Sequence, residues 1–285
     1  MQRITEIPRL QPRRTDAHKG DCGRVLIVGG SAGMIGAPAL AGLAALRSGA
    51  GLVKIATPYS IAQSVGILNP CGTTLPLPED RQGRISTRAA PMLLEQLPLN
   101  DVIVVGPGIN QGTEPRQLIQ HLLRACDKPL ILDADALNNI AALRPYLPTL
   151  RPDTVLTPHP GEFDRLWEAW SRDPQPDDRT EKAAALAEKV GCIVVLKGAG
   201  TVVTDTRRLY VNDTGNPGLA TGGTGDVLTG GIAALAAQGL SLFDATVLGI
   251  WAHGRAADEV VKETGQPGLI ASDLPLALAK ILAQN

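Results

Sequence analysis

The sequence predicts an α/β protein with a central, mainly parallel sheet that is covered by helices on both faces. Short apolar runs rich in β-branched residues recur along the chain, and each ends in Gly, Asp or Pro. Most of them are followed by a segment of helical character. Apolar strands that alternate with helices are typical of a parallel sheet buried on both faces. The six runs are Arg24–Gly30, Gly51–Pro58, Asp101–Gly108, Pro129–Asp135, Thr154–Glu162 and Cys192–Gly198.

The pattern changes after Lys197. The segment TVVTDTRRLYVND predicts two more strands around a tight turn at 205–207, which form an antiparallel hairpin at one edge of the sheet. Helices are expected over about Phe243–Glu263 and Ser272–Ala283. The Pro- and Asp-rich stretches 76–84 and 171–180 are typical of surface loops rather than linkers. We therefore expect a single domain over residues 1–285.

The composition argues against several classes of partner. The formal net charge of the 285 residues is −1, which gives no electrostatic reason to expect nucleic acid or an anionic membrane. Three Trp, three Tyr and two Phe are too few for a base-stacking platform. Hydrophobic residues make up 44% and charged residues 19% of the chain, as in an ordinary compact protein.

The cysteines and the N-terminus indicate a cytoplasmic protein. Cys22, Cys71, Cys126 and Cys192 stand apart, without the spacing of a zinc site, and are expected to be reduced thiols. The first residues, MQRITEIPRLQPRRTD, lack the apolar stretch of a signal peptide, and no run is long enough to span a bilayer.

The stretch from Asn216 to Gly239, NPGLATGGTGDVLTGGIAALAAQG, contains the strongest functional signal. GGTGD lies where a helix begins, so the free amides of Thr224 and Gly225 face outward at the positive end of the helix dipole and form an anion site. Asp226 is either a helix cap or the general base that takes the proton of a hydroxyl attacking phosphorus. Gly230 and Gly231 are expected to let the helix sink into the core.

Other polar groups follow predicted strands. Asp135 is expected to be a helix N-cap, whereas Asp133 can face a ligand or a metal. TPHPGEF presents His159 and Glu162 for ligand contact and metal hydration, or simply forms a turn with a capping glutamate. The exposed amides of LKGAGTVV, with Lys197, suit a nucleotide's phosphate or ribose, although an ordinary hairpin has the same appearance.

Two glycine-rich turns complete the candidate site. In VGPGIN, Gly108 leaves a floor without side chains, which suits a flat ligand and equally a simple strand-to-helix turn. At Ala37, in the glycine-rich loop after the first predicted strand, Arg24–Gly30, a ligand can touch the backbone. The dinucleotide fingerprint G-x-G-x-x-G does not fit here, because Ser31 stands where its first glycine is required.

These motifs together resemble a known family. GTGD after a hairpin strap resembles the anion hole and catalytic aspartate of the ribokinase-like superfamily. Within it, HKGDCGRVLIVGGSAGMIGAPALAGLAALRSGAGLVKIATP, GPG, TPHPGE, KGAGT and GNPGLATGGTGDVLTG resemble the NAD(P)H-hydrate dehydratases, in order from about His18 to Asp258. The resemblance implies a three-layer α/β/α sandwich with a mainly parallel sheet and an edge hairpin.

The resemblance also implies a reaction. A hydro-lyase of this family removes water from the S-epimer of hydrated NADH or NADPH, driven by hydrolysis of ADP or ATP with Mg²⁺. Asp226 would deprotonate the ring hydroxyl, the terminal phosphoryl group would move onto it, and phosphate would then leave by elimination. Bacterial stand-alone members typically use ADP, so ADP is expected here.

The family's site residues carry over by motif. The hydrated dinucleotide would contact Ala37, Gly108, His159 and Asp226. The nucleotide would lie against Lys197, Gly198, Ala199, Gly200, Thr201 and Gly225. Glu162 would organise Mg²⁺ through water. Related vitamin kinases have an asparagine three residues before this glutamate, where this chain has His159, so their metal geometry does not transfer directly.

Assembly and partners follow from the resemblance as well. A homo-oligomer, by resemblance a tetramer, is expected, with NAD(P)H-hydrate epimerase as the functional partner. Some members carry an epimerase domain upstream, but only seventeen residues precede His18, so a stand-alone dehydratase is expected. Two other interpretations stay open: a kinase of the same fold for a thiazole or pyrimidine alcohol, and a catalytically silent dinucleotide-binding regulator.

Overall fold

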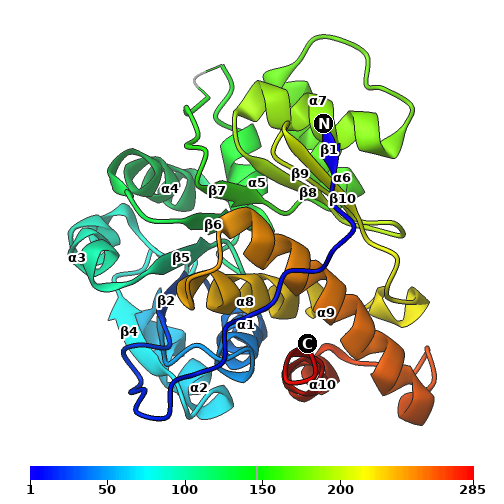
Figure 1. The fold of residues 1–285 in the computed structure, drawn as a ribbon. Coiled ribbons are helices and arrows are strands. Elements are labelled where there is room, and N and C mark those ends of the chain that lie inside the picture. The colour runs from blue at the N-terminus through cyan, green and yellow to red at the C-terminus, as the bar shows by residue number, and fades with distance from the viewer. Residues whose placement is uncertain (146) are drawn as a thin grey trace.

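Ten strands form one sheet in the order β1-β10-β9-β8-β7-β6-β5-β2-β3-β4 in the computed structural model, which describes residues 1–145 and 147–285 (Figure 1). The strands from β8 to β4 in this order are all parallel, which confirms the predicted sheet. β9 runs antiparallel to β8 and β10. The strands are β1 Gln2–Arg3, β2 Arg24–Val28, β3 Leu52–Pro58, β4 Thr73–Leu77, β5 Val102–Val105, β6 Leu130–Leu132, β7 Thr154–Leu156, β8 Ile193–Leu196, β9 Val202–Thr204 and β10 Arg208–Val211.

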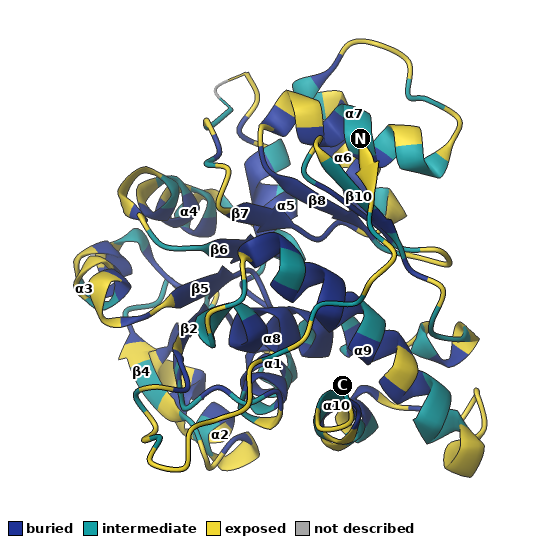
Figure 2. Ribbon diagram, in the orientation of Figure 1, coloured by how far each residue is buried: buried dark blue, intermediate teal, exposed yellow. Residues whose placement is uncertain are grey.

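Helices cover both faces of the sheet, because successive strand residues point to opposite sides. Leu26 and Val28 of β2 join one buried cluster with α3 to α7, whereas Val25 and Ile27 join another with α1, α2, α8 and α9 (Figures 1 and 2). The α-helices are α1 Gly36–Arg47, α2 Tyr59–Leu68, α3 Ala90–Gln96, α4 Thr113–Ala125, α5 Asp135–Ala141, α6 Pro160–Trp170, α7 Arg179–Val190, α8 Thr224–Ala237, α9 Leu242–Thr264 and α10 Leu274–Leu282. Short 3₁₀ turns are η1 Thr87–Ala89, η2 Leu97–Leu99, η3 Pro217–Leu219 and η4 Ala271–Asp273.

Two strands were not predicted from the sequence. β4 includes Pro76 and Leu77, which were expected in a loop; proline is tolerated there because β4 is an outer strand and one of its sides needs no ladder hydrogen bonds. β1 has only two residues, too few for an alternating pattern. Since β1 pairs with β10, the predicted hairpin β9–β10 lies one strand in from the edge.

The sheet topology places one group of loops together. β6, β7 and β8 are adjacent and parallel, so their carboxyl ends meet at the same edge of the sheet, where open α/β sheets bind ligands. α8 begins beside this edge (Figure 1). Among the described residues, no helix has the length and apolarity needed to cross a bilayer.

The close approach of α8 to α1 depends on Gly230, as predicted. A Cβ at this position would lie 2.0 Å from the carbonyl oxygen of Ala41. We expect Gly230→Ala to force the helices apart and to lower the free energy of unfolding by at least about 1–3 kcal/mol in a denaturant titration. Gly66→Ala in α2 is the matched control, because its Cβ would meet only Thr74 Cγ2 at 3.7 Å. The control is expected to gain about 0.5–1 kcal/mol, and a similar loss at both positions would contradict the packing argument.

Candidate active site

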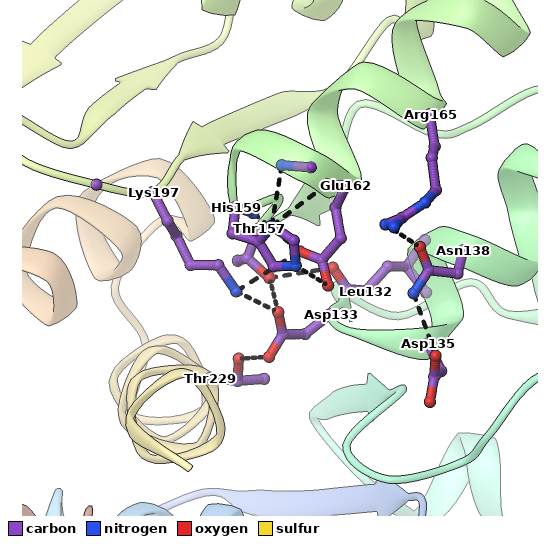
Figure 3. A network of polar contacts seen from close by, with 12 residues as sticks. Leu132, Asp133, Asp135, Asn138, Thr157, His159, Glu162, Arg165, Lys197 and Thr229 are labelled. Atoms are coloured by element: carbon purple, nitrogen blue, oxygen red, sulfur yellow. Dashed lines mark hydrogen bonds and ion pairs between the residues drawn. The ribbon is translucent and has the colours of Figure 1, made fainter. Parts of the chain in front are cut away.

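Asp133 is the buried centre of the polar network at the strand ends (Figure 3). Its carboxylate is 1% exposed and accepts three hydrogen bonds, from the residue that follows β7, the residue that follows β8, and α8. Thr157 Oγ1 donates to Oδ1 at 2.6 Å, Lys197 Nζ to the same oxygen at 2.9 Å, and Thr229 Oγ1 to Oδ2 at 2.8 Å. Burial alone would raise the pKa of Asp133, but the Lys197 charge and these donors outweigh it and lower the pKa. Asp133 therefore stays ionised.

Lys197 lies between two buried carboxylates. Its ammonium group, with 19% of the side chain exposed, is 2.9 Å from Asp133 Oδ1 and 3.9 Å from Glu162 Oε2. Burial lowers the pKa of Lys197, but the Asp133 and Glu162 charges outweigh this and keep it above its ordinary value. A Cβ at Gly225 would lie 3.4 Å from Lys197 Nζ, so the ammonium reaches the first turn of α8.

Asp226 is the third residue of α8 and is half-buried beside this cluster. Its carboxylate accepts no hydrogen bond from the described part of the chain, so it does not cap the helix. Burial, followed by the negative charge of Asp133, raises its pKa to about 7, although Lys197 opposes the shift. A half-buried carboxyl group with this pKa and no partner is suited to accepting a proton near neutral pH.

The start of α8 offers unpaired donors next to Asp226. The backbone N–H groups of Thr224, Gly225 and Asp226 donate to no acceptor within residues 1–145 and 147–285. His253 of α9 fixes this turn, because its buried imidazole Nε2 lies 3.0 Å from the Thr224 carbonyl oxygen. Burial lowers the pKa of His253 to about 4, so the ring is neutral and Nε2 donates. The free amides that the sequence predicts at this helix N-terminus are present, and their binding of an anion stays a prediction.

His159 and Glu162 cap α6, as the plainer of the two interpretations of TPHPGEF predicts. His159 Nδ1 accepts from the amides of Gly161 at 3.0 Å and Glu162 at 3.4 Å, and Glu162 Oε2 accepts from the His159 amide at 2.8 Å. Burial, followed by the Lys197 charge, lowers the pKa of His159. The imidazole is nevertheless 53% exposed, so capping leaves part of the ring open to a ligand.

The residues here fit a hydrated Mg²⁺ ion but no protein cage for a metal. No group of three or more His, Cys, Asp or Glu side chains within the described ranges is arranged to hold an ion. Glu162 is 5% exposed, and burial, followed by the charge of Asp133, raises its pKa. Mg²⁺ commonly keeps several waters and uses one or two carboxylates plus substrate phosphates. Contact through water to Glu162 fits this pattern.

The segment Lys197–Thr201, here called the strap, connects β8 to β9. Gly198, Ala199 and Gly200 are exposed, and the amides of Ala199, Gly200 and Thr201 find no acceptor among the described residues. Thr201 Oγ1 closes the loop by donating to the Gly198 carbonyl at 2.8 Å. The predicted nucleotide segment therefore presents a row of free donors to solvent.

The two remaining predicted contacts, Ala37 and Gly108, lie together. A Cβ at Gly108 would be 3.2 Å from Ala37 Cβ, and the Gly108 carbonyl accepts from Ser31 Oγ at 2.8 Å. Leu40, one helical turn after Ala37, contacts the turn before α8, because a Cβ at Gly223 would lie 2.9 Å from Leu40 Cδ1. The start of α1 and the start of α8 are thus neighbours.

Asp135 was predicted wrongly. The N-cap of α5 is Ala134, with φ +51° and no side-chain cap, and Asp135 is the first residue of the helix. The Asp135 carboxylate instead accepts hydrogen bonds from Gln111 and Asn138 at 3.1 Å each. Asp133 turns into the buried network rather than toward solvent, because Lys197, Thr157 and Thr229 occupy its lone pairs.

Four polar residues of the site were missed from the sequence: Thr157, Thr229, Arg179 and His253. Thr229 stands three residues after Asp226 in an otherwise apolar helix, and this spacing on one helix face was a usable signal. Arg179 is a cation at a helix N-terminus, where the helix dipole disfavours it. Thr157 opens the motif TPHPGEF but was not singled out within it, and no sequence pattern marks His253.

Comparison with known sequences supports the expected family. A family model described as NAD(P)H-hydrate dehydratase matches residues 25–281. The bifunctional NAD(P)H-hydrate repair enzyme Nnr of Moorella thermoacetica is 43% identical over 271 residues, which are 95% of this chain and 50% of that protein. The Escherichia coli enzyme of the same name is 41% identical over 274 residues, 96% of this chain and 50% of that one. The chain thus spans about half the length of the curated relatives it matches.

Solved structures give the same picture. An ADP/ATP-dependent NAD(P)H-hydrate dehydratase from Bacillus subtilis, co-crystallised with ATP and Mg²⁺, is 32% identical with a TM-score of 0.81, covering 97% of this chain and 94% of that one. A ribokinase-like superfamily protein from Enterococcus faecalis is 25% identical with a TM-score of 0.83, covering 96% and 92%. These likenesses confirm the ribokinase-like α/β fold.

Proposed function

Because the chain belongs to the NAD(P)H-hydrate dehydratase family, we propose that it removes water from the S-epimer of hydrated NADH or NADPH, driven by hydrolysis of ADP to AMP and phosphate. The observation that carries this proposal is Asp226, a carboxyl group of pKa about 7 that accepts no hydrogen bond from the described residues and lies next to amides that likewise find no acceptor there, at the start of α8. We also propose that residues 1–285 form one dehydratase domain.

The proposed chemistry has two steps. Asp226 accepts the proton of the ring hydroxyl while the hydroxyl oxygen attacks the terminal phosphorus of ADP, which forms a phosphate ester and releases AMP. The ester's C–O bond then breaks, phosphate leaves with that oxygen, and a neighbouring C–H proton is lost to restore the ring double bond. The free amides of Thr224 and Gly225 stabilise the charge on the transferred group.

Each part of the site has a role in this scheme. Ala37, Gly108 and His159 contact the hydrated dinucleotide, and Asp226 reaches its hydroxyl. Lys197 neutralises the moving phosphoryl group from beside Gly225. Gly198, Ala199, Gly200 and Thr201 hold the nucleotide through their backbone, for which the free strap amides are the support. Mg²⁺ held through water by Glu162 would supply charge neutralisation on the phosphates.

The experiment that tests the proposal mixes the purified protein with hydrated NADH, Mg²⁺ and either ADP or ATP and follows the return of NADH absorbance. Recovery that depends on nucleotide is expected, faster with ADP. If NADH absorbance does not return with either nucleotide, the proposed dehydratase activity is wrong. A stable phosphate ester without NADH would indicate an alcohol kinase. Nucleotide and hydrate binding without any turnover would favour the regulator.

The pH dependence follows from Asp226. As the proton acceptor it must be ionised, so kcat/KM is expected to rise with pH through about 7 and then level off. Asp133 and Lys197 keep their charges over this range, because their ion pair lowers the pKa of the carboxyl group and raises the pKa of the ammonium group. The pH dependence of kcat/KM, which reports the pKa values of the free enzyme, measures this. A profile that is flat between pH 6 and pH 8 would contradict the assignment of Asp226 as the base.

Partner and assembly stay predictions. Since the proposed reaction takes only the S-epimer, an epimerase activity would widen its supply, and the relatives named as bifunctional repair enzymes are about twice as long as the matched region. The tetramer is proposed from the family resemblance. The cytoplasmic location is proposed from the isolated cysteines and from the N-terminal residues, which lack the apolar stretch of a signal peptide.

A further inference from the structure

The guanidinium group of Arg179 binds the strap through its backbone carbonyl oxygens. Its Nη2 donates to the Leu196 carbonyl at 2.9 Å and also to the Lys197 carbonyl, and its Nε donates to the Gly200 carbonyl at 3.2 Å. One guanidinium group thus holds three carbonyls, one at the end of β8 and two in the strap. Charged donors with a planar fork make strong and directional hydrogen bonds.

The backbone conformation of the strap fits this arrangement. Gly198 has φ +141°, and a Cβ there would lie 2.6 Å from Arg179 Nη2, so only glycine lets the guanidinium pack against the loop. With three carbonyls turned toward Arg179, the amides of Ala199, Gly200 and Thr201 have no acceptor in the described part of the chain. Successive free amides of this kind form anion-binding concavities.

The place of Arg179 in its own helix adds a second observation. It is the first residue of α7, where the helix dipole disfavours a cation, and the N-cap function is performed by Asp178, which accepts from the amides of Thr180 and Glu181. Helix stability therefore gives no reason for an arginine there. The strap carbonyls do.

We propose that Arg179 is a positioning residue for the nucleotide: by holding the carbonyls of Leu196, Lys197 and Gly200 it keeps the strap amides aimed at the nucleotide's phosphates. The inference rests on the proposed function for the identity of the ligand. It does not place Arg179 in contact with substrate, and it assigns a role to the end of the segment 171–180, which the sequence indicated only as a surface loop.

The test compares Arg179→Met and Arg179→Lys with the wild type. For the Met variant we expect the Kd for ADP with Mg²⁺, measured by calorimetry, to rise about tenfold or more, since several charge-assisted hydrogen bonds are lost. The kcat at saturating ADP should change by less than about threefold. Backbone hydrogen exchange of Lys197 and Gly198, whose amides donate to the Pro158 carbonyl and to Thr201 Oγ1, should speed up without nucleotide. Arg179→Lys keeps the charge but not the fork, so its affinity should stay clearly below that of the wild type.

Arg151→Met is the matched control, because Arg151 also donates to one backbone carbonyl, that of Cys126, away from the strap. It should leave the Kd for ADP unchanged. Unchanged ADP affinity, or unchanged exchange of the Lys197 and Gly198 amides, in Arg179→Met would overturn the inference, as would full affinity in Arg179→Lys; if the Met variant does not fold, the Lys variant decides. A wild type that binds ADP but regenerates no NADH overturns the proposed function alone, and one that binds neither ADP nor ATP overturns both.

Discussion

Replacing Asp226 with asparagine is expected to lower kcat by about 10²- to 10⁴-fold, the contribution of a positioned general base. Asparagine keeps the shape of the side chain but takes up no proton. ADP affinity should be retained or improved, because the change removes a negative charge beside the phosphates. Turnover of hydrated NADH and calorimetric titration with ADP measure the two quantities separately.

The same substitution should stabilise the protein, which separates it from a folding defect. The folded-state pKa of Asp226 is raised from 3.8 to about 7, so the folded protein binds this proton more tightly than the unfolded chain. The stabilisation of the folded protein by protonated Asp226 is then lost as pH rises from about 4 through about 7. At pH 8 the ionised carboxylate destabilises the folded protein. The melting temperature of Asp226→Asn at pH 8 should exceed that of the wild type.

Asp244→Asn is the control for Asp226→Asn. Asp244 is also the third residue of its helix, α9, but it accepts from Ser241 Oγ and lies 3.7 Å from Arg208. Its replacement should leave turnover unchanged. Retained turnover in Asp226→Asn, or an equal loss in Asp244→Asn, would show that Asp226 is not the base.

Replacing Lys197 with methionine is expected to lower the free energy of unfolding by about 3–5 kcal/mol, the usual effect of leaving a buried charge without its partner. Asp133, 1% exposed, and Glu162, 5% exposed, would both lose the ammonium group between them. Denaturant unfolding at pH 7 measures the change. Turnover should fall as well, since the charge near Gly225 is removed.

A second variant and a control make this prediction specific. Lys197→Met combined with Asp133→Asn removes both members of the pair and should recover part of the lost stability. Lys262→Met breaks an exposed pair, Lys262 Nζ to Glu259 Oε2 at 2.6 Å, and should cost at most about 1 kcal/mol. Equal losses for Lys197→Met and Lys262→Met would contradict the burial argument.

The sequence was sufficient to predict the parallel sheet. It was also sufficient to predict that the main polar groups of the site lie at one edge of that sheet. Six runs of continuous apolar residues could only be strands buried on both faces, and parallel strands bring their carboxyl ends together. His159, Glu162 and Lys197 therefore had to meet at one edge, as they do. β4 was missed because its residues, TTLPL, include a proline that only an outer strand accepts.

The pairing of individual side chains was beyond the sequence. Lys197 forms its ion pair with Asp133, 64 residues away, and neither spacing nor residue type distinguishes Asp133 from Asp135 as that partner. In the structure Ala134, with φ +51°, separates the buried Asp133 from Asp135, which is the first residue of the helix. Arg179 likewise depends on tertiary contact with a loop that follows it by seventeen or more positions.

Oxygen tracing is the most direct test of the phosphorylation and elimination steps. The hydrate is prepared in ¹⁸O water, so that its ring hydroxyl is labelled, and is then converted by the protein with ADP and Mg²⁺ in ordinary water. If the phosphoryl group moves onto that hydroxyl and leaves with it, the phosphate released will carry one ¹⁸O for each NADH formed. Unlabelled phosphate, with the ¹⁸O recovered in water, would contradict the mechanism, because the nucleotide would then be hydrolysed by solvent rather than by transfer to the substrate.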